Sequence, residues 1–324
     1  MTSAAIRDRL YSLWATLTDP RMDQLLQRDN VVPSSFLTDS NINLILDDLS
    51  PSQTAGENLE KKPPVLFLRR PTTIITDHPI NHYNDFFRSV RIDPSPAVRL
   101  EKIFSSEWMP FYRGMPLARY LDDWAMGGYP RFIPHNVPDL ATLCGIHSVA
   151  TPHALNAETR GFLRAGPPTG IQWETYIYEY SESKPDGSTV NPHLILLSAQ
   201  SCTGVDNTIS LGELTTIVTA MRCRAYQPAV FDEDAVLVGD VEQSEDGNPK
   251  PDDERKLAFK DEKRFPVIMV SLVGPQHARA IYACMDGLKL CIRMSRCYMI
   301  RTDSEEMLHN IAGVLLSSPL TENA

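Results

Sequence analysis

Apolar residues recur with helical spacing in several segments of the chain. The clearest is 211–226, where Ser210 and Glu213 also have the spacing of a capping box at a helix start. Segments 5–17, 96–108, 116–125 and 304–316 are also predicted to be helices. One face of the clearest helix consists of Leu211, Leu214, Ile217, Val218, Met221 and Ala225.

Other apolar runs are short, continuous or rich in β-branched and aromatic residues, which is typical of strands. Predicted strands cover 65–68, 72–75, 173–180, 193–197, 265–273, 278–285 and 288–300. Asp286-Gly287 is a strong hairpin signal between the last two. Residues 126–170 are rich in Gly and Pro and are predicted to form loops and short turns. The fold class is therefore α+β, a mostly antiparallel or mixed sheet flanked by helices.

Two polar segments divide the chain. Residues 50–64 are rich in Pro, Ser and charge and are predicted to link an N-terminal arm, 1–63, to a single domain, 64–324. Residues 231–264 hold 12 acids and 6 bases, and so carry −6 of the net charge of −10. We expect an exposed acidic loop at about 239–263.

Composition excludes some classes of protein. No run approaches the roughly 18 apolar residues of a membrane-spanning helix, and the N-terminus has no continuous apolar run typical of a secretory signal. None of the six cysteines is spaced as C-x-x-C, which favours reduced thiols in a cytoplasmic protein without a membrane partner.

Metal and cofactor motifs are weak. His78 and His82 have ligand spacing, but Pro79 between them disfavours the helical turn that would align them. Cys144 and His147 have no second pair at matching spacing, and no nucleotide-binding loop is present. We expect neither a metal nor a cofactor.

The polar stretch Gly274-Pro-Gln-His-Ala-Arg279 separates two apolar strands and is the most informative candidate site. A bend needs only Gly and Pro, whereas Gln276, His277 and Arg279 can bind an anionic or carbonyl group. The alternative is solvation of a hairpin.

Four further residues are candidates. Glu213 can act with His277 as a general acid or base, although the capping box explains its position equally well. Arg293 can add to a phosphate-binding surface with Arg279, and Trp173 and Glu174 can receive a cationic group.

The order of these elements also carries a resemblance. Gly212-Glu213-Leu214 opening a helix, the stretch from Phe265 to Arg279 and the Asp286-Gly287 hairpin resemble a large group of filamentous-fungal proteins, over residues 170–320. The chain is similar to the arginine-containing cyclodipeptide synthases among fungal proteins. This resemblance implies an enzyme that joins amino acids taken from aminoacyl-tRNA, with arginine as one substrate.

The same element order resembles a PD-(D/E)XK nuclease core. The third strand, Cys291-Ile-Arg-Met-Ser295, lacks the acid-x-lysine pair of those nucleases, and Glu182-Ser-Lys184 falls before the helix. Two alternatives therefore stay open: a nucleic-acid-binding protein on a catalytically degenerate scaffold, and a metal-dependent nuclease with other residues.

Overall fold

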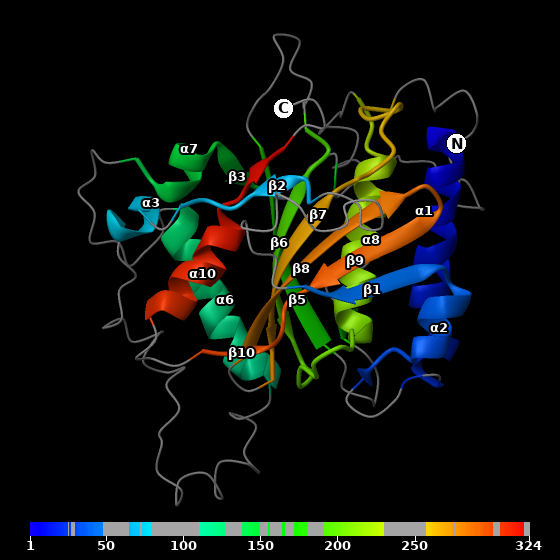
Figure 1. The fold of residues 1–324 in the computed structure, drawn as a ribbon, viewed down its shortest axis with the longest axis horizontal. Helices are drawn as coiled ribbons and strands as arrows, with labels where there is room; N and C mark the ends of the chain where they lie inside the picture. Colours follow the sequence, from blue (N-terminus) through cyan, green and yellow to red (C-terminus); the bar gives the residue numbers. More distant parts are fainter. Residues whose placement is uncertain are drawn as a thin grey trace, which may run out of the picture.

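A mixed sheet of nine strands runs through the centre of the protein, with helices on both faces (Figure 1). The computed structural model describes residues 1–24, 26, 30–47, 65–71, 73–78, 110–126, 138–149, 155, 164–165, 172–180, 191–229, 257–274, 277–300 and 305–320. The helices are α1 (Ser3–Thr18), a 3₁₀ turn (Pro20–Gln24), α2 (Ser34–Asp39), α3 (Thr73–Thr76), α6 (Pro110–Met126), α7 (Leu140–Cys144), α8 (Leu211–Ala225) and α10 (Glu305–Leu315). The strands are β1 (Ile42–Leu46), β2 (Phe67–Leu68), β3 (Ile146–Ser148), β4 (Arg164–Ala165), β5 (Gln172–Tyr180), β6 (Leu194–Gln200), β7 (Val267–Val273), β8 (His277–Asp286), β9 (Lys289–Met294), β10 (Tyr298–Met299) and β11 (Ser318–Pro319).

The strand order in the main sheet is β1-β9-β8-β7-β6-β5-β3, with β10 paired to β8 and β4 to β5. β1 is parallel to β9 and β6 is parallel to β7, whereas the other pairs are antiparallel. Helix α8 connects the two parallel strands β6 and β7. The predicted hairpin joins β8 to β9, and Gly287 adopts φ +61° there, a conformation that favours glycine. The α+β class is confirmed.

Each face of the sheet has its own apolar core. Alternate residues of the central strands point to opposite faces, so Met269 packs toward α8 and its neighbour Val270 packs toward α6 and α10. The strands β6 and β7 are buried on both faces, which explains their continuous apolar sequences.

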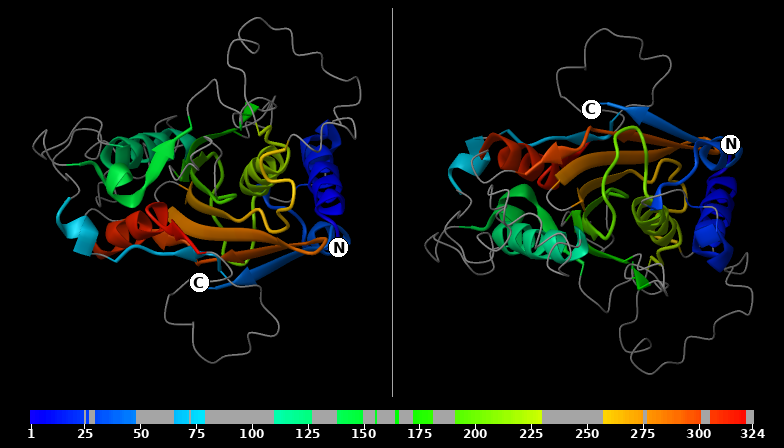
Figure 2. Two further views of the ribbon diagram at one scale, coloured as in Figure 1. Left: turned by 90° about the horizontal axis from the view of Figure 1, so that it is seen from above. Right: turned by 90° about the horizontal axis from the view of Figure 1, so that it is seen from below.

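Helix α8 is buried along its whole length because α1 covers the side that faces away from the sheet (Figure 2). The apolar stripe of α1 packs into the same core, and the guanidinium of Arg222 lies 4.2 Å from the ring centroid of Trp14. The described part of the predicted N-terminal arm is therefore docked. Strand β1 also extends the main sheet, so the boundary drawn at residue 64 separates β1 from its partner strand β9.

Some local predictions fail. The run at 72–75 was expected to be a strand because its residues are β-branched, but Thr73–Thr76 form the short helix α3. The predicted loop region 126–170 contains α7, β3 and β4.

Other predictions lie partly or wholly outside the described residues. These are the helix at 96–108, the whole linker at 50–64, and the acidic loop up to residue 256. The end of that loop is described, and Leu257 and Phe259 are buried there. Within the described part of the chain, no helix is long and apolar enough to cross a membrane.

Candidate functional site

Four polar side chains form a row across the sheet face that α8 covers. Thr175 of β5 pairs in register with Ser198 of β6, Ser198 with Ser271 of β7, and Ser271 with Arg279 of β8. Cross-strand partners share a face of the sheet, so the four lie side by side. The hydroxyl oxygens of Thr175 and Ser198 are 2.8 Å apart. We call Thr175, Ser198, Ser271 and Arg279 the polar row.

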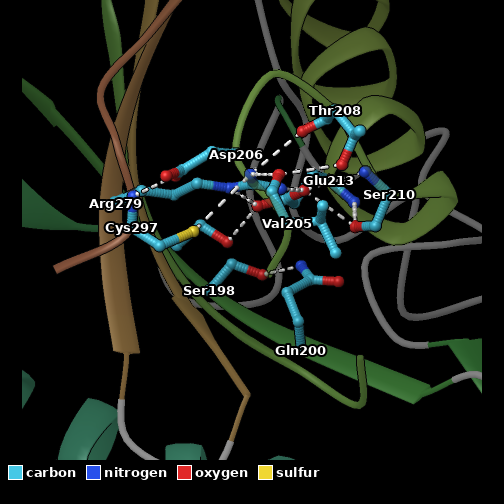
Figure 3. Close-up of polar contacts among 10 residues, drawn as sticks. Ser198, Gln200, Val205, Asp206, Thr208, Ser210, Glu213, Arg279 and Cys297 are labelled. Atoms are coloured by element: carbon cyan, nitrogen blue, oxygen red, sulfur yellow. Dashed lines mark hydrogen bonds and ion pairs between the residues drawn. The ribbon is translucent and has the colours of Figure 1, made fainter. Parts of the chain in front are cut away.

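The carboxylate of Glu213 reaches the polar row from the first turn of α8 (Figure 3). Its Oε1 accepts hydrogen bonds from Ser271 Oγ and Arg279 Nε, each at 2.7 Å. Its Oε2 accepts from the backbone N–H of Ser210 at 2.9 Å, from Ser210 Oγ at 2.8 Å and from Arg279 Nη2. The capping box is therefore present, and the same carboxylate also binds the sheet.

The guanidinium of Arg279 is engaged on its other side by the loop before α8. Nη1 donates to the carbonyl oxygens of Val205 at 3.1 Å and Thr208 at 2.9 Å, and lies 3.8 Å from Cys297 Sγ. A buried charge is costly unless it is paired and hydrogen-bonded, and Arg279 meets both conditions. The pair fixes the loop and the start of α8 against β8.

Both members of this pair are charged in the folded protein. Burial raises the pKa of Glu213, but the charge and hydrogen bonds of Arg279, with those of Ser210 and Ser271, outweigh it and hold the pKa below its usual value. Burial lowers the pKa of Arg279, but the carboxylate of Glu213 more than compensates and raises it. Glu213 is 0% exposed, so this carboxylate orients Arg279 and meets no solvent.

The polar row leads to a more accessible group at the end of β8. His277 lies two residues before Arg279 and so on the same face, and it is half-buried. Cys297 is also half-buried, and its backbone N–H donates to Asp206 Oδ1 at 2.8 Å. We call His277, Cys297 and Asp206 the thiol–imidazole cluster. Met299, two residues after Cys297, pairs with His277, so the cysteine and histidine are diagonal neighbours, roughly 7–8 Å apart at Cα.

The charges around the cluster affect its protonation. Burial lowers the pKa of His277, an effect that the nearby carboxylate of Asp206 partly offsets. The imidazole is therefore neutral at pH 7 and can accept a proton. Burial raises the pKa of Cys297, while the charge of Arg279 acts in the opposite direction.

The other sequence-predicted site residues lie elsewhere. Trp173 is 0% exposed and packs in the core beside Gly212, whereas Glu174 is half-buried and its carbonyl accepts a bond from Ser198 Oγ. Arg293 bonds Asp47 Oδ2 through Nε at 2.9 Å. Its partner across β8 is Tyr282, so it lies on the opposite sheet face from Arg279, and the two do not form one surface. Gln276 lies outside the described residues.

The sequence names Glu213, His277 and Arg279 as separate candidates, and it does not indicate the residues that lie between them. Ser198 and Ser271 are single serines inside the apolar runs Leu194–Gln200 and Val267–Val273, and this interruption was the available signal. No sequence pattern indicated that Asp206 or Cys297 belongs to the site. Only the pairing of β10 with β8 places Cys297 beside Arg279.

A second buried ion pair holds the other end of α8. Arg224 Nη2 lies 2.7 Å from Glu179 Oε2, and Glu179 Oε1 lies 3.1 Å from His147 Nε2. The helix therefore carries an acid at its N-terminus and a base at its C-terminus, each bound to the sheet and each favourable to the helix dipole. His147, which forms a weak ligand motif with Cys144 in the sequence, therefore contacts the carboxylate of this ion pair.

Among the described residues, no group of three or more His, Cys, Asp or Glu side chains is arranged to hold a metal ion. The comparisons with known proteins add no assignment: no family model, curated protein or solved structure matches the chain.

Proposed function

We propose that this protein is a cytoplasmic biosynthetic enzyme that joins amino acids from aminoacyl-tRNA, in the manner of a cyclodipeptide synthase, with arginine as one substrate. One observation carries the proposal: a thiol, an imidazole and a carboxylate gather at an accessible end of the sheet, beside a buried arginine. The resemblance of residues 170–320 supports the substrate class.

The chemistry requires few groups. An aminoacyl ester is already activated, so the amine of one aminoacyl group attacks the ester carbonyl of the other. An amide bond forms, the ester C–O bond breaks, and the tRNA hydroxyl leaves with a proton. A second such step closes the ring and releases the second tRNA. No electrons are transferred.

The cluster supplies these needs in the proposal. Neutral His277 takes the proton of the attacking amine and returns it to the leaving hydroxyl. Cys297 lies at the same end of the sheet, 3.8 Å from Arg279 Nη1. Glu213 has no solvent exposure, so it acts by positioning Arg279, which donates to the loop that carries Asp206. The exposed Arg296 beside Cys297 offers a cation to the phosphate backbone.

The test is to incubate the purified protein with arginyl-tRNA and a mixture of other aminoacyl-tRNAs, and to search for cyclic dipeptides by mass spectrometry. We expect an arginine-containing product from the wild type and from His309→Ala, a matched substitution on α10. We expect at least a hundredfold less product from His277→Ala, as for loss of a general base.

Other outcomes separate the alternatives. Salt-sensitive tRNA binding without product favours a nucleic-acid-binding protein, and magnesium-dependent shortening of the RNA favours a nuclease. Equal product from His277→Ala and the wild type would remove His277 from the mechanism.

A further inference from the structure

A second site lies on the opposite face of the sheet from Glu213. A cavity of about 130 Å³, partly open to solvent, lies between β7, β8, β10 and α10, near the end of β2. It is lined by Arg69, Val270, Arg279, Ala280, Ser295, Tyr298, Met307, Asn310, Ile311 and Val314. Arg279 lines the cavity through its position on β8, because its guanidinium bonds Glu213 on the other face of the sheet.

The walls of this cavity are mostly apolar. Val270 and Ala280 form the sheet side, and Met307, Ile311 and Val314 form the helix side. Ala280, in the middle of β8, is only partly buried, although its neighbours along the strand are buried. An apolar cavity of roughly 150 Å³ is known to hold a benzene molecule. The space therefore suits one ring or a short branched chain.

The described charge at the edge of the cavity is positive. Arg69 Nη2 donates to the backbone carbonyl of Asn310 at 2.7 Å, and no described carboxylate lies within ion-pairing distance of this guanidinium. Burial lowers the pKa of Arg69, so the cation is partly desolvated, and no described carboxylate compensates for this. None of the described lining residues is acidic. Such a cation is stabilised by an anion that enters the cavity.

The remaining polar groups at the cavity are suited to a carboxylate. Tyr298 offers a hydroxyl, and Asn310 offers a side-chain amide. An arginine can bind both oxygens of a planar carboxylate at once.

We propose that this cavity binds a small monocarboxylate whose apolar body is about the size of one aromatic ring. The body lies between Ala280, Met307 and Ile311, and the carboxylate faces Arg69 and Tyr298. The site is separate from the thiol–imidazole cluster, and it does not depend on the proposed function.

The probe for a first test is benzoate, titrated into the full-length protein by calorimetry and by NMR of methyl-labelled methionine. We expect saturable binding with a shift of the Met307 methyl signal. Benzyl alcohol, which keeps the ring and lacks the charge, is expected to bind at least tenfold more weakly. 2-Naphthoate is expected to bind more weakly, because its second ring does not fit within about 130 Å³.

Three variants locate the site. Arg69→Gln is expected to weaken benzoate binding by about tenfold or more, the effect of losing a charged hydrogen-bond donor. Arg296→Gln removes an exposed guanidinium two residues from Tyr298 that does not line the cavity, and it is expected to bind benzoate as the wild type does. Ala280→Ile fills the cavity with a residue that suits a strand, and it is expected to abolish binding while the protein stays folded.

The proposal is overturned if benzoate does not bind the wild type, or if it binds Ala280→Ile unchanged. It is also overturned if Arg69→Gln and Arg296→Gln weaken binding equally, because binding would then follow surface charge alone. Cyclic dipeptide formation is measured separately, so either proposal can fail without the other.

Discussion

Glu213 and Arg279 stand 66 residues apart in the chain and meet in a buried ion pair, with Glu213 Oε1 accepting from Arg279 Nε at 2.7 Å. The first comes from the capped start of α8 and the second from β8. Ser210 and Ser271 complete the bonds of the carboxylate. The pair therefore joins α8, the strands β7 and β8, and the loop before α8 at one point.

Breaking this pair on one side is expected to be severe. Glu213→Gln leaves the guanidinium of Arg279 buried without a counter-ion, which is expected to lower the free energy of unfolding by about 3–5 kcal/mol. Urea denaturation measures this. The double variant with Arg279→Met removes both charges and is expected to be more stable than Glu213→Gln alone.

Asp19→Asn is the control, since Asp19 and Arg21 form an exposed pair and its loss is expected to have no measurable effect. An unchanged unfolding midpoint for Glu213→Gln would contradict the structural role of the pair.

The buried His193 is expected to make the folded protein less stable in mild acid. Its ring lies 5.1 Å from that of Phe67, and burial lowers its pKa from 6.5 to about 4. Between these two values the unfolded chain binds a proton that the folded protein does not, so stability falls as pH decreases from about 6.5 to about 4. The shift corresponds to about 3 kcal/mol.

His193→Phe removes this titration and keeps an aromatic ring in the cluster. We expect the unfolding free energy of the variant to depend less on pH than that of the wild type between pH 6.5 and 4, as measured by urea denaturation at several pH values. Identical slopes would show that His193 does not titrate in this way.

Replacing Gly212 by alanine is expected to destabilise the protein, although this substitution usually stabilises a helix. Alanine normally stabilises a helix interior by about 1 kcal/mol relative to glycine. Here its Cβ would lie 2.2 Å from Gln200 Oε1 and 3.0 Å from Trp173 Cε3. Gly212→Ala is therefore expected to cost about 1–3 kcal/mol.

Gly114→Ala in α6 is the matched control, because its nearest neighbour would be Ala199 Cβ at 3.3 Å. Thermal unfolding compares the two. A gain in stability for Gly212→Ala would mean that α8 can move away from Gln200.

Cys297 is expected to be the first cysteine that iodoacetamide modifies in the folded protein. The other five are buried. Because burial raises the pKa of its thiol, the rate is expected to keep rising above pH 9. Peptide mass spectrometry after short exposure identifies the site, and denatured protein gives the reference in which all six react. Earlier labelling of Cys202, which lies near the same ion pair, would contradict this order.

The sequence by itself determined the elements whose signals are local. The apolar period and the capping box of Ser210 placed α8 to within a residue, and Asp286-Gly287 placed the β8–β9 hairpin. A strand or helix with a strong local pattern needs no distant partner to be recognised. Thr73–Thr76 shows the limit, because their β-branched residues favour a strand and the short segment forms a helix.

Only the tertiary structure decided which candidate residues lie together. Glu213, Arg279 and Arg293 carry the same charges in any arrangement, but strand register places the two arginines on opposite faces of the sheet. Burial turns Glu213 into the partner of Arg279, and the pairing of β10 with β8 brings Cys297 to them. Register and burial depend on contacts between residues far apart in the chain, and for this reason a single sequence does not contain them in readable form.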